Sequence, residues 1–272
     1  MDVAAALALA RRRGVERLDA QRLLAQHLAR PRSWLIAHGD AALPAEAEQR
    51  FCADLERRAG GEPLAYLLGE REFHGLRFAV TPAVLVPRPE TEHLVDWALE
   101  LLAELRGRPR VIDLGTGSGA IAVSVAQRCP AAQVSATDVD AGALAVAAAN
   151  AQAHGCAVEW LQGSWWSALP PDRRFELVLS NPPYIAGNDP HLAALTHEPR
   201  HALTPGGDGL DALRAIITGA PAHLEPGAWL LVEHGFDQGA AVRGLLSVAG
   251  FQQVQTRRDL AGHERCSGGC FP

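Results

Sequence analysis

Apolar residues recur at helical spacing through the first part of the chain. Val3, Leu7 and Ala10 begin the pattern, and leucines repeat it further on. This spacing places the apolar side chains on one face of each helix. Proline suits the first turn of a helix, and Pro44 stands directly before an Ala-Glu-Ala-Glu run. The pattern therefore predicts an N-terminal helical bundle over residues 1–68.

Short strand-like runs replace the helical pattern after Gly69. They cover residues 72–74, 77–80 and 84–86. Gly75 offers a turn between the first two runs, so we predict a β-hairpin connector over residues 69–88. The segment Arg88–Glu92 then leads into an amphipathic helix, either as a plain helix start or as part of the wall of a substrate site.

Strands and helices alternate over the rest of the chain, residues 89–272. Strand-length apolar runs lie at residues 111–114, 133–137, 157–161, 175–179, 229–233 and 252–256. Helical patterns fill residues 118–128, 141–153, 208–222 and 237–249. Such alternation predicts an α/β domain with a mostly parallel sheet covered by helices.

Composition and charge narrow the class of protein. The 272 residues are enough for one large and one small domain, and 48% hydrophobic with 21% charged residues is typical of soluble proteins. A net charge of -6 argues against binding nucleic acid through charge alone, despite arginine clusters at residues 11–13 and 106–110. We expect no stable nucleic-acid binding and a monomer.

Cysteine usage and the N-terminal residues bear on the compartment. Five cysteines at irregular spacing favour a reducing environment. No run reaches the ~18 apolar residues that a membrane span needs. The N-terminal Ala/Leu run precedes Arg11–Arg13, which is the reverse of the order in a secretion signal. We expect a cytoplasmic protein with no membrane partner.

The strand predicted at residues 175–179 ends in Asn181-Pro182-Pro183-Tyr184, at the sheet edge where α/β folds bind ligands. The prolines cannot continue a sheet ladder. Asn181 can accept a hydrogen bond through its side-chain oxygen and Pro182 through its carbonyl, while Tyr184 adds a flat apolar face. Two acceptors beside one –NH2 group would hold it and disperse the charge it gains on alkylation. A strand with a proline-rich turn is the plain alternative.

A second motif is the glycine-rich turn Gly115-Thr116-Gly117-Ser118-Gly119, between a predicted strand and a predicted helix. Glycines let the backbone approach a ligand closely, and the helix start offers unpaired N–H groups. The G-x-G-x-G spacing differs from the dinucleotide fingerprint. Asp113 just ahead of the turn would crowd a pyrophosphate but suit a cationic ligand.

Acidic and aromatic residues on the next strands extend this site. Asp138 ends the second strand, where a carboxylate can accept both ribose hydroxyls of an adenosine, and Asp140 is close enough to be the alternative. Trp165 and Trp166 follow the third strand and pack either on an adenine or in the core. Together these residues describe a site for S-adenosylmethionine. An acceptor nitrogen held ~3 Å from the methyl carbon, in line with the sulfur, would complete a methyl transfer.

At this point the chain resembles the family of protein-(glutamine-N5) methyltransferases that modify peptide chain release factors. The resemblance is nearly full length and rests on residues 69–75, 86–92, 113–122, 180–185, 197–199, 207–210 and 233–235. It implies a class I S-adenosylmethionine-dependent methyltransferase with a Rossmann-like seven-stranded sheet. It also implies methylation of the glutamine in the Gly-Gly-Gln loop of class I release factors, with S-adenosyl-L-homocysteine as product, supporting translation termination.

The resemblance also assigns roles to residues. It implies that Gly115–Gly119, Asp138 and Trp165 bind the cofactor. It also implies that Asn181–Tyr184 bind the glutamine. Arg88 and Glu198 lie in family-type segments and are assigned to the substrate. The C-terminal segment, residues 265–272, departs from the usual ending of the family, which puts the last strand in doubt. The bundle is the surface on which the release factor would dock.

Other interpretations stay open on the sequence. The same chemistry could serve an exocyclic amino group, such as adenine N6, of DNA or RNA; a nicotinamide-dependent oxidoreductase and a non-catalytic adaptor are further alternatives. The irregular spacing of His263, Cys266 and Cys270 argues against a metal site. A long polar loop with three histidines and Glu198 follows the Asn181 motif and is interpreted as a lid over the substrate.

Overall fold

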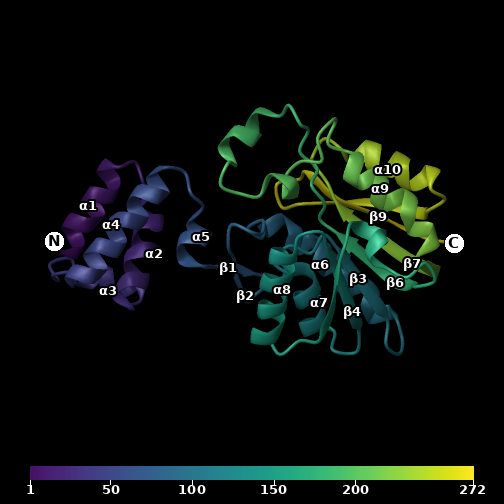
Figure 1. Cartoon of the computed structure of the whole chain (residues 1–272), viewed down its shortest axis with the longest axis horizontal. Helices are drawn as coiled ribbons and strands as arrows, with labels where there is room; N and C mark the ends of the chain where they lie inside the picture. Colours follow the sequence, from purple (N-terminus) through teal and green to yellow (C-terminus); the bar gives the residue numbers. More distant parts are fainter. The chain divides into compact units, whose positions relative to one another are not determined.

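The computed structural model describes residues 1–272 and divides into two units, Met1–Glu70 and Arg71–Pro272 (Figure 1). The predicted boundary at residue 68 lies two residues before the observed one. Each unit has a hydrophobic core of its own. None of the helices is long and apolar enough to cross a membrane.

The N-terminal unit is the predicted helical bundle. Its helices are α1 (Val3–Arg12), α2 (Arg17–Leu28), α3 (Arg32–Ala37), α4 (Ala45–Ala59) and α5 (Leu64–Leu68). Asp2 caps the first helix, because its Oδ1 accepts a hydrogen bond from the backbone N of Ala5 at 2.7 Å. Leu23 and Phe51 are fully buried in the core between the helices.

The connector is a hairpin of β1 (Glu70–Phe73) and β2 (Leu76–Ala79), with Gly75 in the left-handed region at φ +75°. The third strand predicted here, at residues 84–86, is wrong, since this segment is irregular. Val84 and Leu85 instead line a cavity, which accounts for their apolar character. A short 3-10 turn, η1 (Pro89–Thr91), follows.

The second unit contains the predicted sheet. Its seven strands are β3 (Arg110–Leu114), β4 (Gln133–Asp138), β5 (Val158–Gln162), β6 (Phe175–Ser180), β7 (Leu224–Glu233), β8 (Gln252–Arg258) and β9 (Glu264–Cys270). Their order is β5-β4-β3-β6-β7-β9-β8, and β9 alone runs opposite in direction to the other six strands. The order reverses between β3 and β6, which is where open α/β sheets bind ligands.

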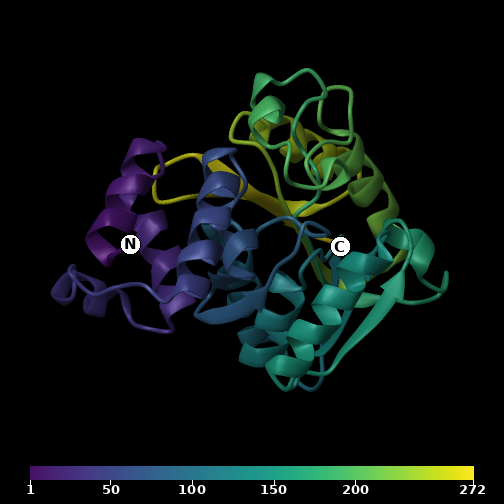
Figure 2. The same ribbon diagram turned by 60° about the vertical axis from the view of Figure 1, so that its left-hand side comes forward.

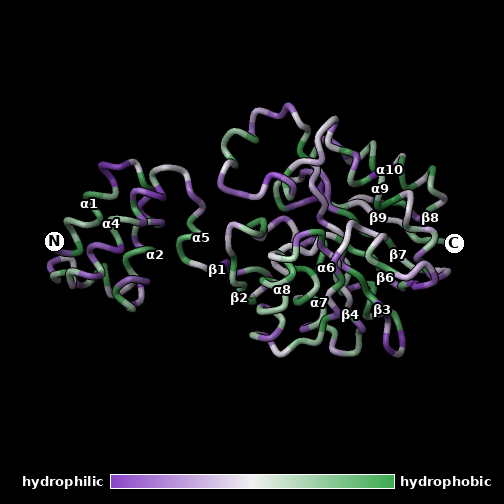
Figure 3. Tube along the Cα trace, viewed as in Figure 1, coloured by the Kyte–Doolittle hydropathy of each residue, from purple (hydrophilic) through white to green (hydrophobic).

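Helices cover both faces of this sheet. They are α6 (Glu92–Glu104), α7 (Ala120–Arg128), α8 (Ala141–Ala153), α9 (Asp211–Gly219) and α10 (Gly239–Val248), with 3-10 turns η2 (Trp165–Ala168), η3 (Pro190–Ala194), η4 (Arg200–Ala202) and η5 (Ala220–Ala222). Neighbouring residues of β6 point to opposite cores: Leu177 packs with α6 and α7, and Val178 with α9 and α10. Figure 3 shows the central strands coloured mainly as hydrophobic.

The last strand forms although its sequence is poor in strand-type residues. β9 pairs antiparallel with β7 over residues 266–270. A Cβ on Gly268 would collide with Leu231, and one on Gly269 would lie 2.9 Å from Phe251 Cβ. The small residues thus permit close packing, which is why an apolar pattern does not mark this strand.

Candidate active site

Two cavities lie side by side at the carboxyl ends of β3, β4 and β6. The larger, of about 160 Å³, is lined by the glycine-rich turn, Asp138 and Trp165. The smaller, of about 110 Å³, is lined by Asn181–Tyr184. Their shared wall is made by Leu85, Arg88, Asn181, Pro183 and Ala202. The two predicted half-sites therefore meet, and Asn181 faces both.

The glycine-rich turn follows β3 and is tied to β4. The backbone N–H groups of Gly115 and Thr116 both donate to the Thr137 carbonyl at 2.9 Å. Gly115 has φ +74°, and a Cβ there would lie 2.9 Å from Trp165 Cζ3. This position therefore needs glycine for its backbone and for the ring beside it. Gly119 also has a positive φ, and α7 begins just after it at Ala120.

Asp113 lies beneath the turn and does not line the cavity. Its Oδ2 accepts a hydrogen bond from the Thr116 hydroxyl at 2.6 Å, while Oδ1 has no partner. Complete burial raises the pKa of this carboxyl to about 7. Asp113 therefore supports Thr116 from below, and its direct contact with a cofactor stays a prediction.

Asp138 stands in the cavity wall at the end of β4. Its Oδ2 accepts from the Gly117 backbone N at 2.9 Å, and its Oδ1 from the Asp140 backbone N at 3.0 Å. Asp140 does not line the cavity; its Oδ1 caps α8 by accepting from the Gly142 N at 2.6 Å. The geometry thus favours Asp138 over Asp140 as the residue that meets a ribose.

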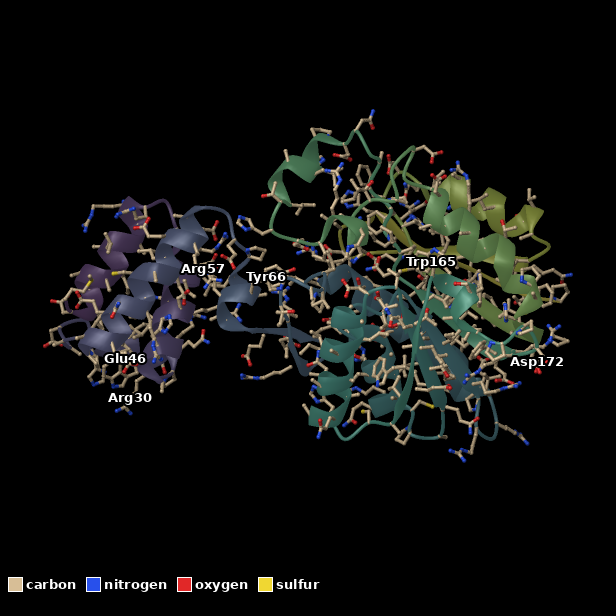
Figure 4. The ribbon with its side chains drawn as sticks, in the orientation of Figure 1. Arg30, Glu46, Arg57, Tyr66, Trp165 and Asp172 are labelled. Carbon is tan, nitrogen blue, oxygen red and sulfur yellow. The ribbon has the colours of Figure 1, made fainter.

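The two tryptophans after β5 have different surroundings. Trp165, labelled in Figure 4, lines the larger cavity. Trp166 packs in the core: its Nε1 donates to the Ile216 carbonyl at 3.0 Å, and its ring stacks on His223 with centroids 5.0 Å apart. Only Trp165 is therefore placed to contact a bound adenine.

The smaller cavity is built around the end of β6. Ser180 ties this strand to β3 through a 2.6 Å hydrogen bond from its Oγ to the Leu114 carbonyl. The Asn181 Nδ2 donates to the Thr91 hydroxyl at 3.0 Å, which leaves the Asn181 Oδ1 without a protein donor. The Tyr184 hydroxyl donates to Glu233 Oε1 at 3.3 Å, and burial raises the pKa of this tyrosine.

A loop over residues 186–206, here called the lid loop, borders both cavities. Figures 1 and 2 show it in green, extending from the body of its unit, and Figure 3 colours much of it as hydrophilic. The base of the loop is closed by a 3.0 Å hydrogen bond from the Ile185 N to the Leu203 carbonyl. His201 lines the larger cavity, and Leu195 and Leu203 line the smaller.

Arg88 and Glu198 meet at this loop. Arg88 Nη2 lies 2.5 Å from Glu198 Oε1 and 2.7 Å from Oε2. Glu198 is buried and does not line either cavity, whereas Arg88 lines both. Glu198 therefore acts on the site by holding Arg88, and of the two side chains only that of the arginine is placed to contact a substrate.

Sequence reasoning missed several residues of the site. Thr91 and Glu233 hold Asn181 and Tyr184, and Val139 and Ser164 line the larger cavity. Glu233 had a usable signal, because a carboxylate that ends a buried strand lies at the binding edge of the sheet. The Thr91 contact joins residues 90 positions apart and has no local signal.

The larger cavity suits a cofactor that carries an adenosine and a positive charge. Asp138 presents a carboxylate, Trp165 an aromatic face and Gly117 a backbone that leaves open space where a Cβ would stand. The orphaned Oδ1 of Asp113 lies just beneath the turn. These donor and acceptor types fit S-adenosylmethionine better than an anionic dinucleotide.

Known proteins resemble the chain over almost its full length. Residues 3–69 match the PrmC N-terminal domain family and residues 92–210 the Methyltransferase small domain family. A release factor glutamine methyltransferase of Bordetella pertussis is 57% identical over 94% of this chain and 95% of its own. The enzyme of that name from Burkholderia pseudomallei is 50% identical over 99% of this chain and 97% of its own. The chain belongs to the release factor glutamine methyltransferase family.

Solved structures support the fold of this family member. The Thermus thermophilus 16S rRNA N2 G1207 methyltransferase, solved with AdoMet and guanosine, superimposes with a TM-score of 0.56 at 19% identity, covering 75% of this chain and 50% of that one. The hMettl16 catalytic domain gives 0.60 at 17% identity, covering 79% and 80%. The methyltransferase fold expected of a release factor glutamine methyltransferase is therefore confirmed.

Proposed function

We propose that this enzyme transfers a methyl group from S-adenosylmethionine to the side-chain amide nitrogen of the glutamine in the Gly-Gly-Gln loop of class I release factors. One observation carries the proposal: Asn181 stands in the wall of both cavities, and its amide oxygen has no protein donor. Membership of the release factor glutamine methyltransferase family supports the choice of substrate.

The larger cavity binds the cofactor. The Asp138 carboxylate would accept hydrogen bonds from the ribose hydroxyls, and Trp165 would pack on the adenine. The backbone of Gly115–Gly119 would run alongside the rest of the cofactor. When bound, S-adenosylmethionine supplies a methyl group on a positively charged sulfur, and S-adenosyl-L-homocysteine is left as product. Because Asn181 and Pro183 separate the two cavities, the methyl group would be directed toward the smaller one.

The smaller cavity binds the glutamine side chain. The Asn181 Oδ1 and the Pro182 carbonyl accept the two hydrogens of the carboxamide, and the Tyr184 ring covers its plane. An amide nitrogen is a poor nucleophile because its lone pair is delocalised into the carbonyl. The two acceptors polarise this nitrogen and stabilise the positive charge that develops as it is alkylated. The nitrogen then releases one of its two protons along the hydrogen bond to one of these acceptors, which restores a neutral amide.

The lid loop covers the glutamine. Arg88 anchors the loop through Glu198, and Leu195 and Leu203 supply an apolar cover to the smaller cavity. Excluding water from the site strengthens the hydrogen bonds to the carboxamide. The N-terminal bundle, residues 1–68, would dock the body of the release factor.

The enzyme is a monomer in the cytoplasm, and its net charge of -6 supports the absence of stable nucleic-acid binding. The alternative activity is methylation of an exocyclic amino group in DNA or RNA, and the experiment must distinguish it from methylation of the release factor.

Labelled cofactor decides between these substrates. The enzyme is incubated with a class I release factor, with the same factor carrying glutamate in place of the Gly-Gly-Gln glutamine, and with DNA and RNA. We expect label in the first factor alone. Label in nucleic acid only, or equal label in both factors, would contradict the proposal.

A further inference from the structure

Gln238 lies in the turn between β7 and α10, and all four of its polar groups are hydrogen-bonded. It caps α10, which begins at Gly239. Its backbone N donates to the Gly235 carbonyl at 2.9 Å, and its own carbonyl accepts from the Val242 N at 3.0 Å. The backbone of Gln238 is therefore fixed by the turn on one side and by the first residues of α10 on the other.

The side-chain amide of Gln238 links this turn to the segment that would bind the glutamine. Its Oε1 accepts from the Gly235 N at 2.9 Å, and its Nε2 donates to the Tyr184 carbonyl at 2.9 Å. Both partners are backbone groups with one possible role each, since an N–H can only donate and a C=O can only accept. The amide therefore has a single orientation, with its –NH2 group on Tyr184.

The segment Asn181–Tyr184 depends on such an anchor because its two prolines supply none. A proline has no backbone N–H, so it cannot donate a hydrogen bond to a neighbouring element. The asparagine amide at one end of the segment is held by the Thr91 hydroxyl at 3.0 Å. The tyrosine carbonyl at the other end is held by Gln238. The position of the Pro182 carbonyl, which lies between these two anchors, depends on both.

Gly209 packs against the same contact. Its φ is +81°, and a Cβ there would collide with the Tyr184 carbonyl oxygen and would lie 3.0 Å from Gln238 Nε2. Residues 207–210 are among the segments on which the resemblance to the family rests. The contact gives this glycine a physical reason, because only a residue without a side chain leaves room for the hydrogen bond.

We propose that Gln238 is a positioning residue for methyl transfer, because its amide fixes the main chain at Tyr184 and with it the Pro182 carbonyl that receives the glutamine –NH2 group. The inference rests on the proposed function and deepens it. Gln238 does not line either cavity, so it acts through Tyr184 and not by touching the substrate. Misplacing a group of the site by about 1 Å can lower a rate about 100-fold.

Two substitutions of Gln238 separate the two hydrogen bonds of its amide. Gln238→Glu keeps the size and the acceptor for the Gly235 N, but at pH 8 it puts a carboxylate oxygen in place of the donor to Tyr184. Gln238→Met keeps the length and loses both bonds. With the full-length enzyme and a class I release factor, kcat should fall about 10- to 100-fold in both variants. Affinity for S-adenosyl-L-homocysteine, measured by calorimetry, should stay close to that of the wild type.

Gln238→Glu distinguishes positioning from a role in the turn alone. A residue that only closes the turn before α10 needs the bond from the Gly235 N, which the glutamate retains. That role predicts a wild-type kcat for Gln238→Glu and a loss for Gln238→Met only, whereas positioning of Tyr184 predicts a loss for both. Gln152→Glu is the matched control, because it adds the same charge at an exposed position near the end of α8. It should keep the wild-type kcat.

A second pair of variants tests the contact from its other side. Gly209→Ala places a Cβ against the Tyr184 carbonyl oxygen and should lower kcat about tenfold or more. Gly227→Ala is the matched control, since this glycine has the same φ of +81° but open space where the Cβ would stand. It introduces the same backbone strain and should keep the wild-type kcat.

The outcomes separate this inference from the proposed function. If the wild-type enzyme does not label the release factor, the proposed function fails. If it does, but Gln238→Glu keeps the wild-type kcat or loses cofactor affinity as strongly as kcat, the positioning role is overturned. Should Gln238→Glu not fold, equal kcat values in Gly209→Ala and Gly227→Ala would overturn it instead.

Discussion

Arg88 and Glu198 form an ion pair across 110 residues of sequence, with Arg88 Nη2 at 2.5 Å and 2.7 Å from the two carboxylate oxygens. Arg88 lies at the end of the connector, and Glu198 belongs to the lid loop. Because the carboxylate is buried and the guanidinium lines both cavities, the pair fixes the lid loop where the glutamine would enter.

Breaking this ion pair should weaken substrate binding. Glu198→Ala leaves Arg88 without its partner, and we expect the KM for the release factor to rise about tenfold or more, since the partly exposed guanidinium is no longer held in place by a buried carboxylate. Affinity for S-adenosyl-L-homocysteine should change less. Arg173→Ala, which breaks a pair with Glu159 away from both cavities, is the matched control. An unchanged KM in Glu198→Ala would remove the lid loop from substrate binding.

Gly115→Ala should abolish most cofactor binding. The new Cβ would lie 2.9 Å from Trp165 Cζ3, on a backbone at φ +74° that already disfavours a side chain. We expect affinity for S-adenosyl-L-homocysteine, measured by calorimetry, to fall about tenfold or more. Gly107→Ala has a similar positive φ and open space around it, so it controls for backbone strain. Equal affinities in the two variants would show that Trp165 does not pack on the cofactor.

Substitutions of the neighbouring residues Asp138 and Asp140 should affect cofactor binding and protein stability separately. Asp138→Asn weakens the proposed ribose acceptor, so cofactor affinity should fall about 10- to 100-fold. Asp140→Ala removes the α8 cap, at a cost of about 1 kcal/mol in the free energy of unfolding, and should leave affinity nearly unchanged. The reverse result, with Asp140→Ala losing affinity and Asp138→Asn keeping it, would exchange their roles.

Sequence patterns predicted most of this fold because burial imposes a regular spacing on the apolar residues of each helix and strand. Strands such as β3 and β6 are mostly apolar and buried, since both of their faces are covered by helices. The same rule misleads at residues 84–86, where apolar side chains line a cavity instead of a sheet. It also fails to mark β9, whose small residues Gly268 and Gly269 permit close packing.

The residues of the site also fall into two groups, those that a sequence motif marked and those that only the structure could identify. Short motifs marked the glycine-rich turn and Asn181–Tyr184 because each sits on a few consecutive residues at a strand end. Choosing Trp165 over Trp166 needed the structure, since only the fold decides which neighbouring ring faces the cavity. Thr91 and Glu233 reach Asn181 and Tyr184 from other elements, and such contacts depend on packing that a local pattern does not encode.

Asp113 should make stability depend on pH. Its pKa of about 7 lies above the ordinary value of 3.8, so the folded protein holds a proton that the unfolded chain releases. This contribution to stability is complete below about pH 4 and is lost as the pH rises through about 7. Thermal melts of Asp113→Asn between pH 4 and 8 should show a weaker dependence on pH than wild type. The remaining dependence comes from Glu233, because burial raises the pKa of this carboxyl to about 7 as well.

Asp172→Asn is the control for these melts, because this exposed aspartate, labelled in Figure 4, lies in a turn before β6. It should melt like wild type at every pH. A wild-type pH dependence in Asp113→Asn would show that the buried carboxyl does not hold a proton in this range.

The helical bundle should contribute to binding of the intact release factor and much less to binding of a peptide that carries only its Gly-Gly-Gln loop. Both units have their own cores, so residues 71–272 can be tested separately. Deleting the bundle should raise the KM for the intact factor far more than that for a short Gly-Gly-Gln peptide. Equal increases for both substrates would refute the docking role.

A crystal structure of the enzyme with S-adenosyl-L-homocysteine and a Gly-Gly-Gln peptide tests the arrangement of the two cavities most directly. We expect the glutamine nitrogen to donate to both the Asn181 Oδ1 and the Pro182 carbonyl, with its lone-pair side toward the sulfur and Asn181 Nδ2 still on Thr91. A glutamine bound elsewhere, or an Asn181 that presents Nδ2 to it, would contradict methyl transfer by this geometry.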